Sequence, residues 1–212
     1  MSKQGIATRE RILDTAHDMV LKQGYAATSL DQILGQAGVT KGAFFYHFKS
    51  KEELARALFE RYLEGDRQVL EQTLHRAEKL ASDPLQQVLL ALGFLEEMFS
   101  GLAEPHPGCL IASYCYQNEL MTPETTAQGR AMLAMWRDAI AAKLRAAAKL
   151  HLPRGEPDYE ALGDLPNVVI EGGFVMAKIY GDPKFLARQI HQLKQFIELL
   201  FDKVPRDQET HR

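Results

Sequence analysis

The residues whose types and spacing best suit chemistry lie within positions 40–51. Hydroxyl and ammonium donors are mixed there with very small residues on the expected outer side of one short helix, which carries Thr40, Lys41, Gly42, Ala43 and Tyr46. Two further cations, Lys49 and Lys51, follow directly. Such donors bind phosphate oxygens and the edges of nucleic-acid bases. The segment therefore suits a nucleic-acid contact better than a covalent reaction.

Two helices are expected before this segment. Apolar residues recur at three- and four-residue spacing from Thr8, and Gly24 ends that helix. Thr28, with Asp31 three residues later, is typical of a capping box that begins the second helix. Gly38 can adopt a positive φ and so permits a turn after it.

The third helix is expected to begin after a Thr40 cap and to reach about His47. Its inner side would carry Val39, Phe44 and Phe48 against the two preceding helices. By the same spacing argument, Phe45 is also expected to be mainly core. Two short helices joined by a tight turn form a helix-turn-helix unit, whose second helix fits the major groove of DNA.

The stretch TSLDQILGQAGVTKGAFFYHFKSKEEL, residues 28–54, resembles the DNA-binding signature of TetR-type transcriptional repressors. Residues 170–186 and the helical pattern of the remaining chain resemble the family's C-terminal half more loosely. The resemblance implies a nine-helix dimer that binds a palindromic operator and releases it when a small molecule binds.

The same resemblance implies which residues meet DNA, matched position by position: Thr28, Ser29, Thr40, Lys41, Gly42, Ala43, Phe45, Tyr46, His47 and Lys51. Phe45 departs from the family pattern, which usually has tyrosine there, so Tyr46 is expected to supply the hydroxyl instead. Asp31 would repel phosphate and is interpreted as a helix cap.

The overall charge hides this signal. The chain has 212 residues, 25 Lys+Arg and 28 Asp+Glu, for a net charge of -3. Residues 1–51 carry +3 and the rest carry -6, so positive charge is concentrated where DNA contact is expected. We expect a helix-turn-helix domain over residues 1–51 and a helical ligand-binding and dimerisation domain over 52–212. A long helix, about 51–79, would link them.

The fold class expected is all-α, with about nine helices and no strand pattern of useful length. A ligand pocket between the later helices would be lined mainly by apolar and aromatic groups. The candidates, each of which can equally be ordinary core, are Phe94, Met98, Phe99, Tyr114, Gln117, Met132, Met135, Trp136 and Phe174.

The last helix shows a four-three-four-three spacing of apolar residues, as in a coiled-coil seam. Burial within one chain would produce the same spacing. Because one recognition helix reads too few base pairs, a homodimer on a palindrome is expected. Its predicted interface comprises Gly173, Ala177, Leu186, Ile190, Leu193, Ile197 and Leu200.

Other function classes lack their motifs. No P-loop, strand-linked GxGxxG, HExxH or GxSxG is present, so neither an enzyme nor a cofactor is expected. His106, Cys109 and Cys115 lack the paired spacing of a zinc site, so no metal is expected. The N-terminus has no apolar signal and the longest apolar run is Val88–Leu95, which predicts a cytoplasmic protein without membrane contact.

We therefore predict a ligand-responsive, homodimeric repressor whose partners are double-stranded operator DNA and a small, apolar or aromatic effector. Two alternatives stay open at this point. One is a helical small-molecule-binding protein or enzyme that keeps the helix-turn-helix for packing. The other is a repressor gated by oxidants or electrophiles at Cys109.

Overall fold

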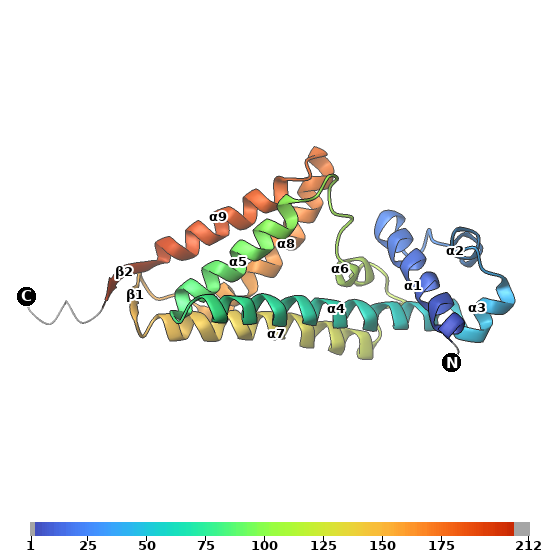
Figure 1. Cartoon of the computed structure of the whole chain (residues 1–212), viewed down its shortest axis with the longest axis horizontal. Helices are drawn as coiled ribbons and strands as arrows, with labels where there is room; N and C mark the ends of the chain where they lie inside the picture. The colour runs from blue at the N-terminus through green and yellow to red at the C-terminus, as the bar shows by residue number, and fades with distance from the viewer. Residues whose placement is uncertain (1–2, 206–212) are drawn as a thin grey trace, which may run out of the picture. The chain divides into compact units, whose positions relative to one another are not determined.

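The computed structural model describes residues 3–205 of the chain, and over this range it contains nine helices and two short strands (Figure 1). The first four helices are α1 (Lys3–Gln23), α2 (Leu30–Ala37), α3 (Lys41–His47) and α4 (Lys51–Leu80). The others are α5 (Pro84–Ser100), α6 (Leu110–Cys115), α7 (Pro123–Ala147), α8 (Tyr159–Tyr180) and α9 (Phe185–Leu200). The expected all-α class is confirmed.

The strands β1 (His151–Pro153) and β2 (Phe201–Pro205) form a small antiparallel ribbon that the sequence did not predict. The ribbon pairs Pro153 with Phe201, next to the end of α9. Its strands are too short for an alternating pattern to show. Among the described residues, no helix combines the length and apolar character needed to cross a bilayer.

The chain divides into two compact units that do not coincide with the expected boundary at residue 51. One unit comprises residues 3–66 and 107–130, and the other comprises residues 67–106 and 131–205. The difference arises because α4 and α7 each contribute to both units, while α6 packs with the N-terminal helices. Within the first unit, the Tyr114 ring stacks on Phe59, and its hydroxyl donates a hydrogen bond to the Ala55 carbonyl at 2.8 Å.

In the second unit, α9 packs against both α5 and α8 (Figure 1). The seam predicted to pair two chains is buried inside this one: the exposed fractions of Leu186 and Ile190 are 1% each. A Cβ added at Gly173 would lie 2.4 Å from Leu186 Cδ1, so Gly173 allows α8 to approach α9 closely. Leu193, Ile197 and Ala177 are buried as well, and Leu200 is half-buried.

Most of the predicted dimer-interface residues are therefore already buried by helices of their own chain, and their role in pairing two chains stays a prediction. Their spacing reports burial, but a burial pattern does not distinguish a partner helix of the same chain from a helix of a second chain.

Candidate nucleic-acid interface

The turn between α2 and α3 is defined by two helix caps and one glycine. Ser29 caps α2: its hydroxyl accepts from the Gln32 backbone, and the Gln32 side chain accepts from the Ser29 backbone. The predicted cap, Thr28 with Asp31, was one residue too early. Gly38 follows α2 at φ 62°, a left-handed conformation that L-residues rarely adopt. Thr40 then caps α3 by accepting a hydrogen bond from the Ala43 backbone, as expected.

One side of α3 is anchored in the core of the first unit. Phe44 is fully buried and Phe48 is 2% exposed, with ring centroids 5.6 Å apart. The Arg9 guanidinium of α1 lies 5.3 Å from the Phe48 ring centroid. The predicted inner side is therefore confirmed for these two residues, and the orientation of α3 is fixed by their packing.

The opposite side of α3 is exposed over its whole length. Tyr46 is 72% exposed and Phe45 is 47% exposed, so the expectation that Phe45 is mainly core is wrong. Lys41 and Gly42 are exposed at the beginning of the helix and Lys49 follows its end. This face offers ammonium groups, a phenol hydroxyl and one apolar ring.

His47 is half-buried between the two sides of α3. Its ring meets that of Tyr46 edge-on, with centroids 4.9 Å apart. Its buried Nδ1 has no hydrogen-bond partner among the described residues. Ala43, also predicted to meet DNA, is likewise half-buried.

Thr28 does not lie where a phosphate contact requires it. Its side chain is fully buried and its hydroxyl donates to the Gly24 carbonyl at 2.7 Å. The Gln23 amide in turn donates to the Thr28 oxygen. A side-chain contact with phosphate, inferred from the resemblance, does not fit this burial. Thr28 instead holds the connection between α1 and α2, while Ser29 beside it is exposed.

Lys51 is half-buried at the first position of α4. Its ammonium donates to the Tyr25 carbonyl at 3.0 Å and lies 4.0 Å from the centroid of the Tyr25 ring. Burial lowers the Lys51 pKa from its ordinary value. Burial, followed by the charges of Glu52 and Glu119, raises the pKa of Tyr25 to about 12. One of three ammonium protons is thus used, and the others remain for a phosphate.

The predicted effector-contacting residues fall into both units. Tyr114 and Gln117 belong to the first, whereas the other seven candidates belong to the second. The rings of Phe99 and Phe174 pack edge-to-face, with centroids 5.7 Å apart. The His106 ring, which was not among the predicted effector contacts, stacks on Phe174 with centroids 4.5 Å apart. Trp136 and Met132 are buried, Met135 is half-buried and Met98 is 47% exposed. Phe94 is half-buried, with the Arg76 guanidinium 3.9 Å from its ring centroid.

Tyr114 is the one candidate that lines a described pocket, of about 490 Å³, in the first unit. The pocket also presents Arg56 and the carboxylates of Glu52, Glu119 and Glu124. The surface of the pocket is mainly apolar, and these charged groups lie among the apolar side chains. Spacing along single helices could not reveal it, because its residues come from α4, α6, α7 and the segment between α6 and α7.

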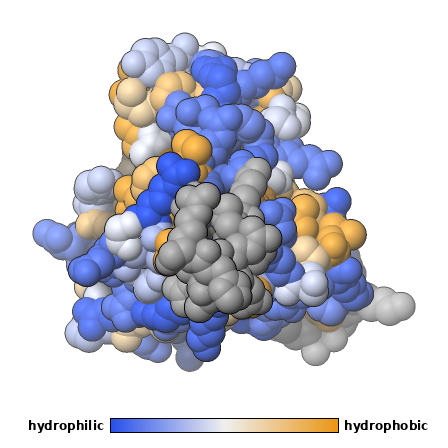
Figure 2. Space-filling view, turned by 90° about the vertical axis from the view of Figure 1, so that its left-hand side faces the viewer, coloured by the Kyte–Doolittle hydropathy of each residue, from blue (hydrophilic) through white to orange (hydrophobic). Residues whose placement is uncertain are grey.

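Hydrophobic residues also gather in patches on the molecular surface, as the face drawn in Figure 2 illustrates. On α8, Val168, Val175 and Ile179 are 63%, 57% and 72% exposed. On α9, Phe196 and Leu199 are 49% and 66% exposed. The spacing of positions 168, 175 and 179 places them on one face of α8, a pattern that the sequence also shows.

Neither cysteine is part of a disulfide; Cys115 is exposed and Cys109 is buried. The Tyr62 hydroxyl lies 3.2 Å from the Cys109 sulfur, to which it donates. The thiol-gated alternative remains a prediction. Among the described residues, no group of three or more His, Cys, Asp or Glu side chains is placed to hold a metal ion.

The N-terminal region of the chain is similar to a known family of bacterial regulators. Residues 12–58 match the model of the family described as bacterial regulatory proteins, tetR family. The uncharacterised HTH-type transcriptional regulator YerO of Bacillus subtilis is 37% identical over 81 residues. That alignment covers 38% of this chain and 27% of YerO. The chain thus spans well under two thirds of that relative.

Longer matches are more distant. The uncharacterised HTH-type transcriptional regulator YxaF of Bacillus subtilis is 27% identical over 173 residues, covering 80% of this chain and 84% of YxaF. A TetR transcriptional regulator of known structure from Chloroflexus aurantiacus shares the fold, with a TM-score of 0.76 at 24% identity. It covers 94% of this chain, and 98% of its own length is matched.

Proposed function

Because the chain belongs to the TetR family of transcriptional regulators, we propose that it is a cytoplasmic repressor that binds a palindromic operator as a homodimer and releases it when a small effector binds. The observation that supports this proposal most directly is α3. This helix is anchored by Phe44 and Phe48 and presents an exposed face with Lys41, Phe45 and Tyr46.

In this proposal, α3 lies in the major groove and its first turn meets base edges. Lys41 donates to guanine acceptors, and the Phe45 ring packs on thymine methyl groups. Ser29, Lys49 and Lys51 lie beside the groove and bind phosphates, which fix register without reading sequence. The neighbouring Tyr46 hydroxyl supplies the contact that a tyrosine at position 45 would give in other members.

The homodimer would form through the apolar faces of α8 and α9 that are exposed here, rather than through the buried seam. Val175 and Ile179 on α8, with Phe196 and Leu199 on α9, leave large apolar side chains in water. Pairing two copies would remove this surface from water and create a four-helix bundle. Two recognition helices would then meet half-sites about 34–36 Å apart, or a multiple of that distance.

Release would follow from a difference in effector affinity between two arrangements of the dimer, since a ligand that binds both arrangements equally shifts nothing. The sequence predicts an apolar or aromatic effector. Because α4 and α7 run through both units, a ligand held by either helix can favour one relation between the units. This change would alter the separation of the two recognition helices.

The test uses two exposed tyrosines as a matched pair. Tyr46 lies on α3, whereas Tyr116, 85% exposed, lies in the segment between α6 and α7. Fluorescence anisotropy would measure binding to a palindromic duplex selected from the DNA upstream of the gene that encodes this chain. We expect Tyr46→Ala to weaken binding about 10-fold or more, which corresponds to one lost polar contact, and Tyr116→Ala to have no effect. Equal affinities for both variants would contradict the assigned face.

A further inference from the structure

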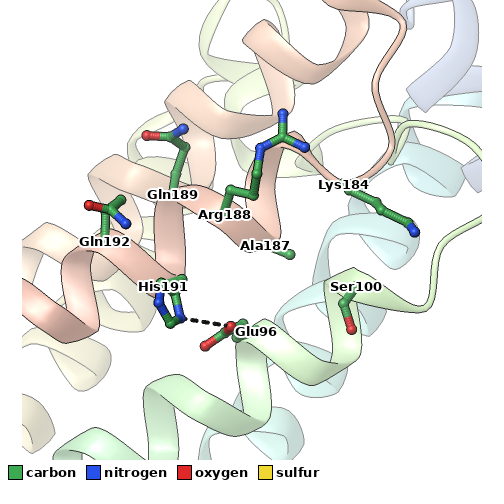
Figure 3. Close-up of a pocket in the computed structure, with 8 residues that line it drawn as sticks. All are labelled: Glu96, Ser100, Lys184, Ala187, Arg188, Gln189, His191 and Gln192. Carbon is green, nitrogen blue, oxygen red and sulfur yellow. Dashed lines mark hydrogen bonds and ion pairs between the residues drawn. The ribbon is translucent and has the colours of Figure 1, made fainter.

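A second hollow lies between the C-terminal half of α5 and the N-terminal half of α9, with a volume of about 710 Å³ (Figure 3). This size is within the range of small-molecule sites. Side chains of α9 lie across the hollow from Glu96 and Ser100 of α5. None of the predicted effector-contacting residues lines it.

One end of the hollow is positively charged. Lys184 directly precedes α9, and its side chain is exposed. Arg188 follows one turn later and pairs with Asp182, which also feels the charge of Lys184. Asp182 also accepts a hydrogen bond from the Lys184 backbone N–H at 3.0 Å, so one carboxylate already lies at the beginning of α9. Two cations, Lys184 and Arg188, thus lie beside this one carboxylate, which leaves a net attraction for an anion.

The other end offers a hydrogen-bond acceptor with fixed geometry. Glu96 accepts from His191 at 3.0 Å and from Lys194 at 2.8 Å. Although burial acts to raise the Glu96 pKa, these two partners outweigh it and lower the pKa below its ordinary value. The group is therefore a carboxylate at neutral pH. Each oxygen has lone-pair capacity left for a hydroxyl of a ligand.

Two amides complete the polar lining. Gln189 and Gln192 of α9 also line the hollow, and each amide carries a donor and an acceptor. An apolar ligand would leave these amides and Glu96 without water or partners, which costs free energy. A simple inorganic anion would use only the Lys184 end. The lining thus matches a molecule that has one negative group and several hydroxyls.

We propose that this hollow binds a small polyhydroxylated anion, a sugar acid or a sugar phosphate. Its anionic group meets Lys184 and Arg188, and its hydroxyls donate to Glu96 and exchange hydrogen bonds with the two glutamines. The site differs in place and in chemistry from the apolar effector site expected from the sequence. Anion binding can be measured without DNA, so the test of this site is independent of operator recognition.

Isothermal titration calorimetry on the full chain would test the site with three probes: gluconate, glucose 6-phosphate and glucose. We expect at least one of the two anions to bind about 10-fold or more tightly than the neutral sugar. The comparison between them shows whether a carboxylate or a phosphate is preferred. Lys184→Gln should weaken anion binding about 5-fold. Lys149→Gln, which removes an exposed cation beyond the end of α7, should leave it unchanged.

Glu96→Gln separates the two ends of the site. It should weaken both sugar anions while having no such effect on inorganic phosphate, which lacks carbon-bound hydroxyls. Circular dichroism would show whether each variant is folded. If Glu96→Gln does not fold, Lys184→Gln still provides the test, because Lys184 is exposed.

Failure of both anions to bind at 10 mM, about the weakest affinity of interest for so small a ligand, would overturn the proposal. Equal effects of Lys184→Gln and Lys149→Gln would also overturn it. So would a Lys184→Gln variant that shifts the monomer–dimer equilibrium in sedimentation yet binds the anions normally, because the hollow would then be a subunit contact.

Discussion

Two adjacent phenylalanines on α3 should lose very different amounts of stability when each is truncated to alanine. Phe44 is fully buried against Phe48, whereas Phe45 is 47% exposed. Removal of a fully buried Phe ring costs about 3–5 kcal/mol, because the lost transfer free energy is joined by a cavity. For Phe45 only part of that area is removed from water on folding, so Phe45→Ala should cost about 1 kcal/mol.

Urea unfolding followed by far-ultraviolet circular dichroism measures the difference. With a slope of about 2 kcal/mol per molar urea, Phe44→Ala should move the midpoint of the first unit down by about 2 M and Phe45→Ala by about 0.5 M. Tryptophan fluorescence is the wrong probe here, because the chain has one tryptophan, Trp136, which lies in the second unit.

The DNA affinities should follow the reverse order once folding is taken into account. At urea-free conditions where both variants are folded, Phe45→Ala should weaken operator binding more than Phe44→Ala. Equal losses of stability in the two variants, or an unchanged affinity for Phe45→Ala, would refute the assigned orientation of α3.

Three further predictions concern the helices, a buried phenol and the subunit contact. A Cβ at Gly163 of α8 would lie 2.4 Å from the Arg137 carbonyl oxygen, so Gly163→Ala should destabilise the chain by about 1–3 kcal/mol. A Cβ at Gly65 of α4 would have no atom within 4 Å, so Gly65→Ala should not destabilise the chain. Thermal unfolding of the two variants would measure the difference. Because the folded state raises the Tyr25 pKa to about 12, the unfolded state loses its proton first as pH rises above 10. The free energy of unfolding should therefore fall between pH 10 and 12, and less so in Tyr25→Phe, as urea titrations at each pH would show. Ile179→Glu places a charge on the exposed apolar face of α8 and should shift the dimer to monomer in analytical ultracentrifugation, whereas Lys178→Glu beside it should not.

Much of the DNA-binding unit could be predicted from sequence because its signals are local. The Thr40 cap, the break at Gly38 and the inward side of Phe44 and Phe48 depend on residues within one or two turns of each other. The cap of α2 was predicted one residue too early because Thr28 and Ser29 are adjacent and both are preferred capping types. Only the three-dimensional fold shows that the Thr28 hydroxyl is already used by the Gly24 carbonyl.

Features built from distant segments were predicted less well. The apolar spacing of α9 was correct as a sign of burial, but its partner is α5 and α8 of the same chain. Phe45 was expected in the core because it lies next to Phe44 on the helix, and spacing alone does not show where the buried face ends. In the structure the neighbouring helices cover Phe44 but leave Phe45 47% exposed. The hollow that contains Glu96 and Lys184 joins positions nearly 90 residues apart, and no local pattern can bring such positions together.

The central claim, that the chain is a sequence-specific repressor acting as a dimer, is tested most directly by a specificity ratio. Anisotropy titrations at about 150 mM salt would compare the selected palindrome with an unrelated duplex of equal length, and sedimentation would give the number of chains bound. The account predicts at least about 10³-fold tighter binding to the palindrome, with two chains per duplex. Equal affinity for both duplexes, or one chain per palindrome at saturation, would contradict it.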